Sequence, residues 1–433
     1  MVNRVAACLG MLALAGCDYL TSSFDTNDSS GDQFPIFVDN ASGAVVIGMQ
    51  EAGDLDQRQA VLDVMSPMTV IDRGPVVPAS METTDVTILG APVAGDDLTL
   101  PRAKVDDLQV TTLHPCDETV RDCTVGTETA PRPFNAVLGL NAFTGDALRL
   151  ALGSDQIFIL PDVAGSDLRR ARSCDSVMSS PFSGGGTLVI GGTEIGFPGL
   201  RIAIDSCMLP RPINRFPNGV PATQAQRGVD ALFVLSTGVG TSLLSRSAYQ
   251  HLRELDSSLP AFDALPEATV FLPSGPVVGN VTTLASIALV SNSGSNPRAP
   301  CRQMWASHLL ALQDCLPGDD CPCQLGETFC GVPAVIELAP LAGIPLLIVP
   351  DTNPTLQSLR AEIRPDRPEV DGILGADAIE ALELDIDFAH NRLLGRCTDR
   401  AVCGARVALP NKEARSYLNG CLDGMPGPIV YEP

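Results

Sequence analysis

Apolar residues occur along this chain in short runs separated by turn residues, a pattern typical of β-strands rather than of long helices. In the first half, one apolar run over residues 135–140 includes Gly139, and Gly153-Ser154-Asp155 forms the turn of a hairpin. Strands are therefore predicted over residues 44–49, 59–63, 148–152 and 156–160. The second half repeats this order, with strands predicted over residues 187–190, 200–204 and 230–235, helices over 245–255 and 376–382, and a hairpin turn at 389–391. The pattern predicts a mainly β chain with a few short helices, built as two lobes that repeat one plan.

The composition suits many short strands. The chain of 433 residues holds 39 Gly and 35 Pro, too many for a helical bundle. It is 45% hydrophobic but only 4% aromatic, so aliphatic side chains must fill its core. The formal net charge is −23, and Lys104 and Lys412 are the only lysines. Such a chain repels phosphate backbones, which argues against nucleic acid as a partner, and its dispersed acidic residues indicate an acidic, soluble surface.

The N-terminal residues have the pattern of a targeting segment. Arg4 precedes an apolar stretch, residues 5–15, that is too short to span a bilayer, and the stretch closes on Leu14-Ala15-Gly16-Cys17. This segment resembles a bacterial lipoprotein signal, which is cut before a cysteine that then receives a diacylglycerol. The resemblance implies a signal peptide over residues 1–17, lipidation of Cys17 and a flexible tether over residues 18–36. It also implies export to the bacterial cell envelope, with lipid as the only anchor in the inner or outer membrane. An ordinary signal peptide is the alternative.

Cysteine usage agrees with an oxidising compartment. Of the 14 cysteines, Cys8 leaves with the signal peptide and Cys17 is the lipidation site, which leaves an even number. Six disulfides are predicted among Cys116, Cys123, Cys174, Cys207, Cys301, Cys315, Cys321, Cys323, Cys330, Cys397, Cys403 and Cys421, with Cys116 and Cys123 suited to a local loop. A zinc site at Cys321, Cys323 and Cys330 is the competing interpretation, but no histidine follows closely. We therefore expect no metal and no other cofactor.

Two ordered pairs of motifs resemble one protein family. In the second half, Phe233-Val234-Leu235-Ser236-Thr237-Gly238 is followed later by Asp371-Gly372-Ile373-Leu374-Gly375-Ala376-Asp377. In the first half, residues 61–67 and Val137-Leu138-Gly139 match the same order more weakly. This order is similar to that of pepsin-like and retropepsin-like aspartic proteases, over about residues 40–165 and 185–396. The resemblance implies a bilobed β-barrel fold of that type, with lobes over residues 37–170 and 171–433.

The resemblance also implies site residues. In that family each lobe supplies one aspartate on a tight loop, and the two carboxyl groups share one proton while they activate a water. Asp63 and Ser236 occupy the positions of these aspartates. Support of the loops falls to Thr237 and Gly238 and to two glycines that end the apolar runs, Gly139 and Gly375. If the lobes face each other, side-chain oxygens of Asp63 and Ser236 should lie within about 10 Å, the reach of a shared water.

The chain departs from the family pattern in both loops. Val64 and Met65 stand where threonine and glycine are expected, and Ser236 stands where the second aspartate is expected. A serine hydroxyl is not an acid at neutral pH, so the carboxylate pair is incomplete. We therefore expect an inactive protein that uses its interlobe cleft for a peptide or protein ligand. An aspartic-type endopeptidase with an altered Asp/Ser site is the alternative.

Two rival assignments of the site residues stay open. Residues 70–74 contain Asp72, a rival to Asp63, although the Ser66-Pro67-x-Thr69 continuation favours Asp63. A constellation of Ser236, His251 and an aspartate is the nucleophilic alternative, although a surface histidine near a helix C-terminus is the commoner situation.

The second lobe is longer than the first. There are 76 residues from Asp63 to Gly139 and 139 from Ser236 to Gly375, a surplus of 63. Most of it is placed in a cysteine-rich insertion at about residues 291–331, with a helix predicted over 303–312. We expect the insertion to be held by disulfides.

Overall fold

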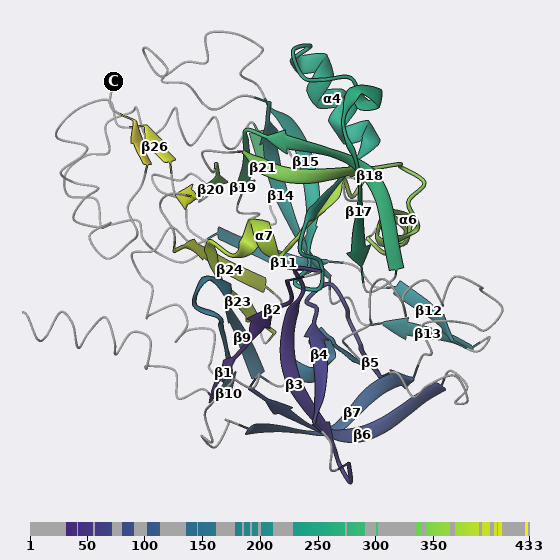
Figure 1. Cartoon of the computed structure of the whole chain (residues 1–433). Helices are drawn as coiled ribbons and strands as arrows, with labels where there is room; N and C mark the ends of the chain where they lie inside the picture. Colours follow the sequence, from purple (N-terminus) through teal and green to yellow (C-terminus); the bar gives the residue numbers. More distant parts are fainter. Residues whose placement is uncertain are drawn as a thin grey trace, which may run out of the picture.

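The computed structural model describes residues 32–40, 42–54, 57–71, 80–90, 102–112, 136–144, 146–161, 178–183, 186–190, 193–197, 201–210, 228–272, 275–290, 300–301, 335–339, 343–363, 369–388, 392–398, 402–404, 406–408 and 429–431. The molecule is mainly β and has two lobes with a shared sheet between them (Figure 1). The fold class predicted from the sequence, a bilobed β-barrel architecture with a few short helices, is confirmed.

Lobe 1 is a seven-stranded sheet in the order β2-β3-β4-β8-β5-β7-β6, and an additional pairing of β3 with β6 closes it into a barrel. Its strands are β2 (Phe37–Val38), β3 (Val45–Glu51), β4 (Arg58–Leu62), β5 (Thr69–Ile71), β6 (Ser80–Leu89), β7 (Arg102–Thr112) and β8 (Ala136–Leu138). The barrel interior is aliphatic, with Ile47, Leu62 and Ile88 almost fully buried.

Lobe 2 contains strands in the order β14-β15-β22-β16-β21-β18-β17. They are β14 (Arg201–Leu209), β15 (Val229–Leu235), β16 (Ser242–Ser245), β17 (Glu267–Leu272), β18 (Gly275–Leu284), β21 (Ile344–Val349) and β22 (Gly372–Leu374). β14 also pairs with β19 (Ser286–Val290), which continues through β20 (Val335–Leu338) to β25 (Cys403–Gly404). The lobe carries α4 (Arg246–Leu255), η5 (Phe262–Ala264) and α6 (Pro354–Glu362). Ser245 and Asn353 cap the N-termini of the two α-helices with their side-chain oxygens.

Six strands join the lobes, in the order β1-β10-β9-β23-β24-β11, and the pairing of β11 with β14 makes them continuous with the sheet of lobe 2. The six strands are β1 (Asp32–Pro35), β9 (Asp146–Ala151), β10 (Gln156–Pro161), β11 (Met178–Ser183), β23 (Leu382–Asp387) and β24 (Arg392–Cys397), with η3 (Leu152–Ser154) between β9 and β10. At the centre of the six, β9 of the first half pairs with β23 of the second. There the buried Arg149 donates to Asp385 across the strands, with 2.8 Å between Nε and Oδ1, and lies 3.2 Å from a carboxylate oxygen of Glu383. A buried ion pair therefore connects the halves.

One three-strand unit occurs in both lobes. β8 pairs in parallel with β4 and antiparallel with β5, and β22 pairs in the same way with β15 and β16. After the unit come η2 (Leu140–Phe143) and α7 (Ala376–Ile379), which begin directly after Gly139 and Gly375. From Gly139 to the end of β10, each residue of the first half has an equivalent in the second half whose number is 236 higher, as Gly375 is equivalent to Gly139. The predicted duplication is confirmed.

The two remaining two-stranded sheets are β12 (Gly186–Ile190) with β13 (Thr193–Phe197), and β26 (Arg406–Ala408) with β27 (Ile429–Tyr431). The predicted helix over residues 376–382 is wrong at its end, because α7 stops at Ile379 and the buried strand β23 starts at Leu382. The predicted helix over residues 303–312 and most of the cysteine-rich insertion lie outside the described residues. Part of the surplus of lobe 2 lies elsewhere, since 29 residues join β16 to β18 and only eight join β5 to β6.

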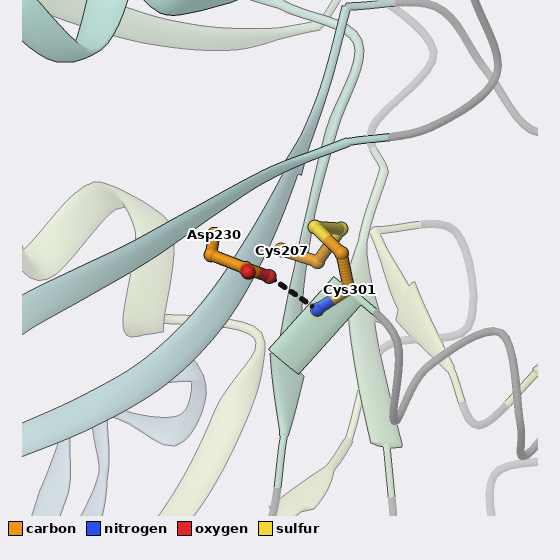
Figure 2. The surroundings of a disulfide bond; sticks show 3 residues. All are labelled: Cys207, Asp230 and Cys301. Atoms are coloured by element: carbon orange, nitrogen blue, oxygen red, sulfur yellow. Dashed lines mark hydrogen bonds between the residues drawn. A yellow bond between two sulfur atoms is a disulfide. The ribbon is translucent and has the colours of Figure 1, made fainter. Parts of the chain in front are cut away.

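One disulfide links Cys207 on β14 to Cys301, and the Cys301 N–H donates to the carboxylate of Asp230 at 2.7 Å (Figure 2). Cys403 is also disulfide-bonded. The side chains of the other predicted disulfide cysteines, including those of the zinc alternative, are outside the described part of the chain. The described residues contain no metal-binding group of three or more His, Cys, Asp or Glu side chains. No described helix combines the length and apolar character needed to cross a membrane.

Candidate functional site

Two equivalent loops lie where the lobes meet, one after β4 and one after β15. Each loop starts from a strand that is paired in parallel with the apolar-apolar-Gly strand of the same lobe. The backbone N–H of Asp63 donates to the carbonyl of Leu138 at 3.1 Å, and that of Ser236 donates to Leu374 at 2.9 Å. The parallel pairing thus fixes Asp63 and Ser236 in equivalent positions.

The structure brings Asp63 and Ser236 into direct contact. The Ser236 hydroxyl donates to Asp63 Oδ1 at 2.8 Å, so the predicted approach of these two side chains is confirmed. The same oxygen accepts the backbone N–H groups of Met65 at 2.9 Å and Gly238 at 3.2 Å. Asp63 is 3% exposed and Ser236 is fully buried. The hydrogen bonds satisfy a carboxyl group that water hardly reaches.

Burial raises the pKa of Asp63 above its usual range, because the charged form loses its hydration. Hydrogen bonds from Met65, Ser236 and Gly238, and then the charge of Arg201, act in the opposite direction and offset burial only in part. Asp63 can therefore take up or release a proton. Ser236 cannot act as the second acid, since its hydroxyl does not ionise at neutral pH, and its role in this contact is to orient the carboxyl group.

Thr237 fastens the two loops together. Its hydroxyl donates to the carbonyl of Leu62 at 2.5 Å and accepts the N–H of Val64 at 3.1 Å. The carbonyl of Thr237 accepts the N–H of Val45 at 2.8 Å. The equivalent residue of lobe 1 is Val64, which has no hydroxyl group and so cannot form the same two hydrogen bonds with the backbone of the lobe 2 loop. The fastening is therefore supplied from lobe 2 alone.

Gly238 and Met65 occupy equivalent positions in the two loops, but only the position of Gly238 lacks room for a side chain. A Cβ added to Gly238 would lie 2.7 Å from Cγ of Asp63, so this position requires glycine. Met65, at the equivalent position of lobe 1, has a Cβ, and the equivalent of Asp63 in lobe 2 is Ser236, which has no carboxyl group. Serine at position 236 thus removes the conflict that a side chain at position 65 would have with an aspartate there.

The two glycines predicted as loop supports are required by close packing. A Cβ on Gly139 would lie 2.4 Å from the Met68 backbone, and one on Gly375 would lie 2.8 Å from the Val239 carbonyl oxygen. The Gly139 N–H donates to the Thr69 hydroxyl at 3.2 Å, and the Gly375 N–H donates to Ser242 at 3.0 Å.

These two hydroxyl groups in turn donate to the side chains of Asn141 and Asp377, at 2.9 and 3.0 Å. The sequence interpretation missed this support. Its signal was the repeated spacing, since each hydroxyl lies six residues after Asp63 or Ser236 and each acceptor lies two residues after a glycine.

Arg201 is a further residue that the sequence interpretation missed. It lies at the start of β14, its guanidinium donates to the carbonyl of Met65, and it forms an ion pair with Glu362 at the end of α6. Both side chains are mostly buried. Arg201 therefore ties the lobe 1 loop to lobe 2, and nothing in the local sequence marks that contact across 136 residues.

The rival assignments fare differently. Asp72 lies outside the described residues. His251 is an exposed residue of α4, whereas Ser236 is buried and bound to Asp63, so the Ser236–His251 constellation is wrong.

Comparisons with known proteins give similarities to solved structures at low sequence identity. No protein-family model and no curated protein matches the chain. Among solved structures, the aspartic proteinase from Irpex lacteus is 12% identical with a TM-score of 0.38, over 86% of this chain and 100% of that chain. The basic 7S globulin from soybean is 12% identical with a TM-score of 0.41, over 87% and 98%. Conglutin gamma from lupine seeds is 11% identical with a TM-score of 0.40, over 85% and 95%.

The chain has an aspartic-protease-like bilobed fold. The strand pairing of the repeated unit, the six strands between the lobes and the two loops in contact define this fold.

Proposed function

We propose that this protein is an aspartic-protease-like binding protein without peptidase activity, exported and held at a bacterial membrane by lipid on Cys17. Its ligand is a peptide or protein that enters the cleft between the lobes. The proposal draws its main support from one contact, the hydrogen bond from Ser236 to Asp63 at 2.8 Å. A single carboxyl group cannot act as both the acid and the base that a bound water needs.

The packing around that contact supports the loss of activity. Asp63 is 3% exposed, so little of it is available to a substrate. The Met65 carbonyl, beside it, already accepts a hydrogen bond from Arg201. An aspartate at position 236 would also conflict with the Met65 side chain, as a Cβ on Gly238 conflicts with Asp63. Several changes, rather than one, separate this site from a working pair.

A peptidase assay tests this part of the proposal. The wild type should not cleave unfolded protein substrates between pH 3 and 7, and Asp63→Asn should give the same result. The matched variant Ser236→Asp/Met65→Gly/Val64→Thr restores the second carboxyl group and the space it needs, and should gain cleavage with an acidic optimum. Cleavage by the wild type that Asp63→Asn abolishes would establish the alternative, an endopeptidase with an altered Asp/Ser site.

Partly buried apolar side chains of the lobe 1 loop and of β17 and β18 favour a ligand of extended peptide character. A cluster of buried lobe 2 side chains that includes Leu232, Val239 and Ile373 is covered by partly buried apolar residues. These are Met65, Ala268, Val270, Val277 and Val281. Such surface is suited to apolar side chains of a bound chain rather than to a polyanion. Substitution of Met65 by lysine should weaken peptide binding without unfolding the protein, whereas Thr144→Lys, on the exposed surface of lobe 1, should not.

The proposed anchor has its own test. Cys17→Ser should move the protein from the membrane fraction to the soluble fraction, because diacylglycerol is the only anchor proposed. A variant that stays in the membrane fraction would contradict lipidation at Cys17. This outcome bears on location alone and leaves the cleft proposal intact.

A further inference from the structure

The two ends of β22 carry acidic side chains where the equivalent strand of lobe 1 carries amides. Asp371 directly precedes β22, and Asp377 lies two residues after Gly375. The constant shift of 236 places Asn135 and Asn141 at these positions in lobe 1. Asn135 lies outside the described residues, and Asn141 is described. The strand that supports the Ser236 loop therefore differs from its counterpart by two ionisable groups.

Asn141 shows what the position after the glycine requires. Its Oδ1 accepts the N–H and hydroxyl of Thr69 at 2.8 and 2.9 Å, and its Nδ2 donates to the carbonyl of Gln109 at 2.7 Å. In lobe 2, Asp377 Oδ1 accepts the Ser242 hydroxyl at 3.0 Å. In lobe 1, Thr69 pairs with Val110, and Gln109 is the residue before Val110. In lobe 2, Ser242 pairs with Leu346, so the residue equivalent to Gln109 is Pro345. A carbonyl accepts but does not donate, so only a protonated Asp377 can reproduce the donor of Asn141.

Asp377 is set in a mostly unfavourable surrounding for a charge. Burial raises its pKa to about 6, against the hydrogen bonds that it accepts. The described charged residues that line the same cavity are Glu380, directly after α7, and Glu383 of β23. The guanidinium of Arg149 forms ion pairs with Glu383 and Asp385. Asp377 and these two glutamates line a cavity of about 660 Å³ together with Ser154 and Thr398. A polar cavity of this size can admit water, which would give the carboxyl group a route for proton exchange.

Asp371 has the same character at the other end of the strand. Its Oδ2 accepts the backbone N–H of Leu232 at 2.9 Å, which holds β22 against β15. Burial again raises the pKa to about 6, with a smaller contribution from Glu369. The Leu232 bond and the charges of Arg360 and His251 act in the opposite direction.

We propose that Asp371 and Asp377 make β22 a pH-sensitive support of the Ser236 loop, firm when both carboxyl groups are protonated and weakened when they ionise. Lobe 1 has amides at both positions, so the strand that supports its loop lacks these two ionisable groups. Asp63, whose pKa is also raised by burial, is bonded to the backbone of both loops, so its ionisation acts on the two lobes together. The consequence is a molecule whose interlobe contact is tighter in acid than at neutral pH.

The direction follows from linkage. A carboxyl group with a folded pKa of about 6 and an ordinary value of 3.8 when unfolded binds protons more tightly in the folded state. Its stabilising contribution is complete below pH of about 4, declines as the pH rises to about 6, and is absent above that. Each group is expected to change the folding equilibrium roughly a hundredfold across this window.

Amide hydrogen exchange at pH 4.5 and 7.5, corrected for the intrinsic rates, tests the proposal in one molecule. Protection of residues 236–240 and 374–380 should fall at least about tenfold relative to residues 62–66 and 138–143 as the pH rises. Asp371→Asn/Asp377→Asn should remove this difference, and Asn141 shows that an amide fits the geometry. The reverse variant Asn141→Asp should introduce the same loss in lobe 1.

Equal loss of protection in both lobes of the wild type would overturn the proposal. So would a double variant that keeps the wild-type difference between the lobes. If Asn141→Asp does not fold at pH 7.5 but folds at pH 4.5, that result supports the proposal, because it is the expected effect in a stronger form.

Discussion

Lobe 1 and lobe 2 contribute different groups to the contact between their loops. Lobe 1 supplies the carboxyl group of Asp63, and lobe 2 supplies Thr237 and Gly238. These groups contact each other, since Gly238 leaves room for Asp63 and Thr237 binds the loop that carries it. At the equivalent positions of the other lobe stand Ser236, Val64 and Met65, so neither lobe has the full set. The loops therefore hold the lobes together through one asymmetric set of contacts.

The lobes also differ in their additions. The described part of lobe 2 contains α4, η5 and β17 between β16 and β18, where lobe 1 has eight residues between β5 and β6. Its β14 is fixed by a disulfide to Cys301, which follows β19. The following variants probe these asymmetries, from the largest expected effect to the smallest.

Removal of the disulfide between Cys207 and Cys301 is expected to have the largest effect. Cys207→Ala/Cys301→Ala opens a closed loop of 94 residues and should lower the free energy of unfolding by about 4 kcal/mol. Urea unfolding of the oxidised protein measures this. Hydrogen exchange should show the loss in β14, β15 and β19 before the lobe 1 barrel. A loss that begins in lobe 1 would contradict the expectation that this disulfide stabilises lobe 2 first.

Gly238→Ala should be far more harmful than the equivalent change in lobe 1. The new Cβ would lie 2.7 Å from Cγ of Asp63, so we expect a loss of about 3 kcal/mol in the free energy of unfolding. Met65→Ala keeps a Cβ at the equivalent position and should cost about 1 kcal/mol through lost packing. Chemical denaturation of both variants gives the comparison. Similar losses would show that the two positions are not differently constrained.

Thr237→Val should cost about 2 kcal/mol, because it leaves the buried Leu62 carbonyl and Val64 N–H without their hydroxyl partner. The mirror change, Val64→Thr, supplies a hydroxyl to the loop that lacks one and should be close to neutral. The melting temperatures of the two variants distinguish them. A large fall in the melting temperature of Val64→Thr would mean that the packing around Val64 cannot accommodate a hydroxyl group.

Asp63→Asn should have the smallest effect, with a sign that depends on pH. The raised pKa of Asp63 means that its contribution to stability is complete in acid and declines as the pH increases past the folded value. The amide keeps an acceptor for Ser236 and carries no charge, so the variant should be more stable than the wild type by about 1 kcal/mol at pH 7.5 and no more stable at pH 4. Thermal unfolding at the two pH values measures this crossover.

The sequence predicted the fold from short motifs that recur in order. The pairs formed by Asp63 with Gly139 and by Ser236 with Gly375 located both three-strand units, because apolar strands that end in a loop or a glycine leave a clear signal. The contact between Asp63 and Ser236 was predicted from the same repetition. What remained hidden involved partners without local signal. Arg201 reaches Met65 and Glu362 across long stretches of chain, and the α7 boundary depends on pairing with β9, not on helix propensity.

The position of β9 against β23 has a consequence for how the molecule is made. These strands form the centre of the sheet between the lobes, yet they are separated by more than half of the chain, with Leu150 opposite Leu384. During synthesis the N-terminal barrel can assemble early, but one side of β9 stays an open strand edge until β23 has emerged. Contacts of such sequence separation form slowly, and open edges invite pairing with other chains. Arg149, buried in the finished protein, is a charged residue on that edge and opposes premature pairing until Asp385 arrives.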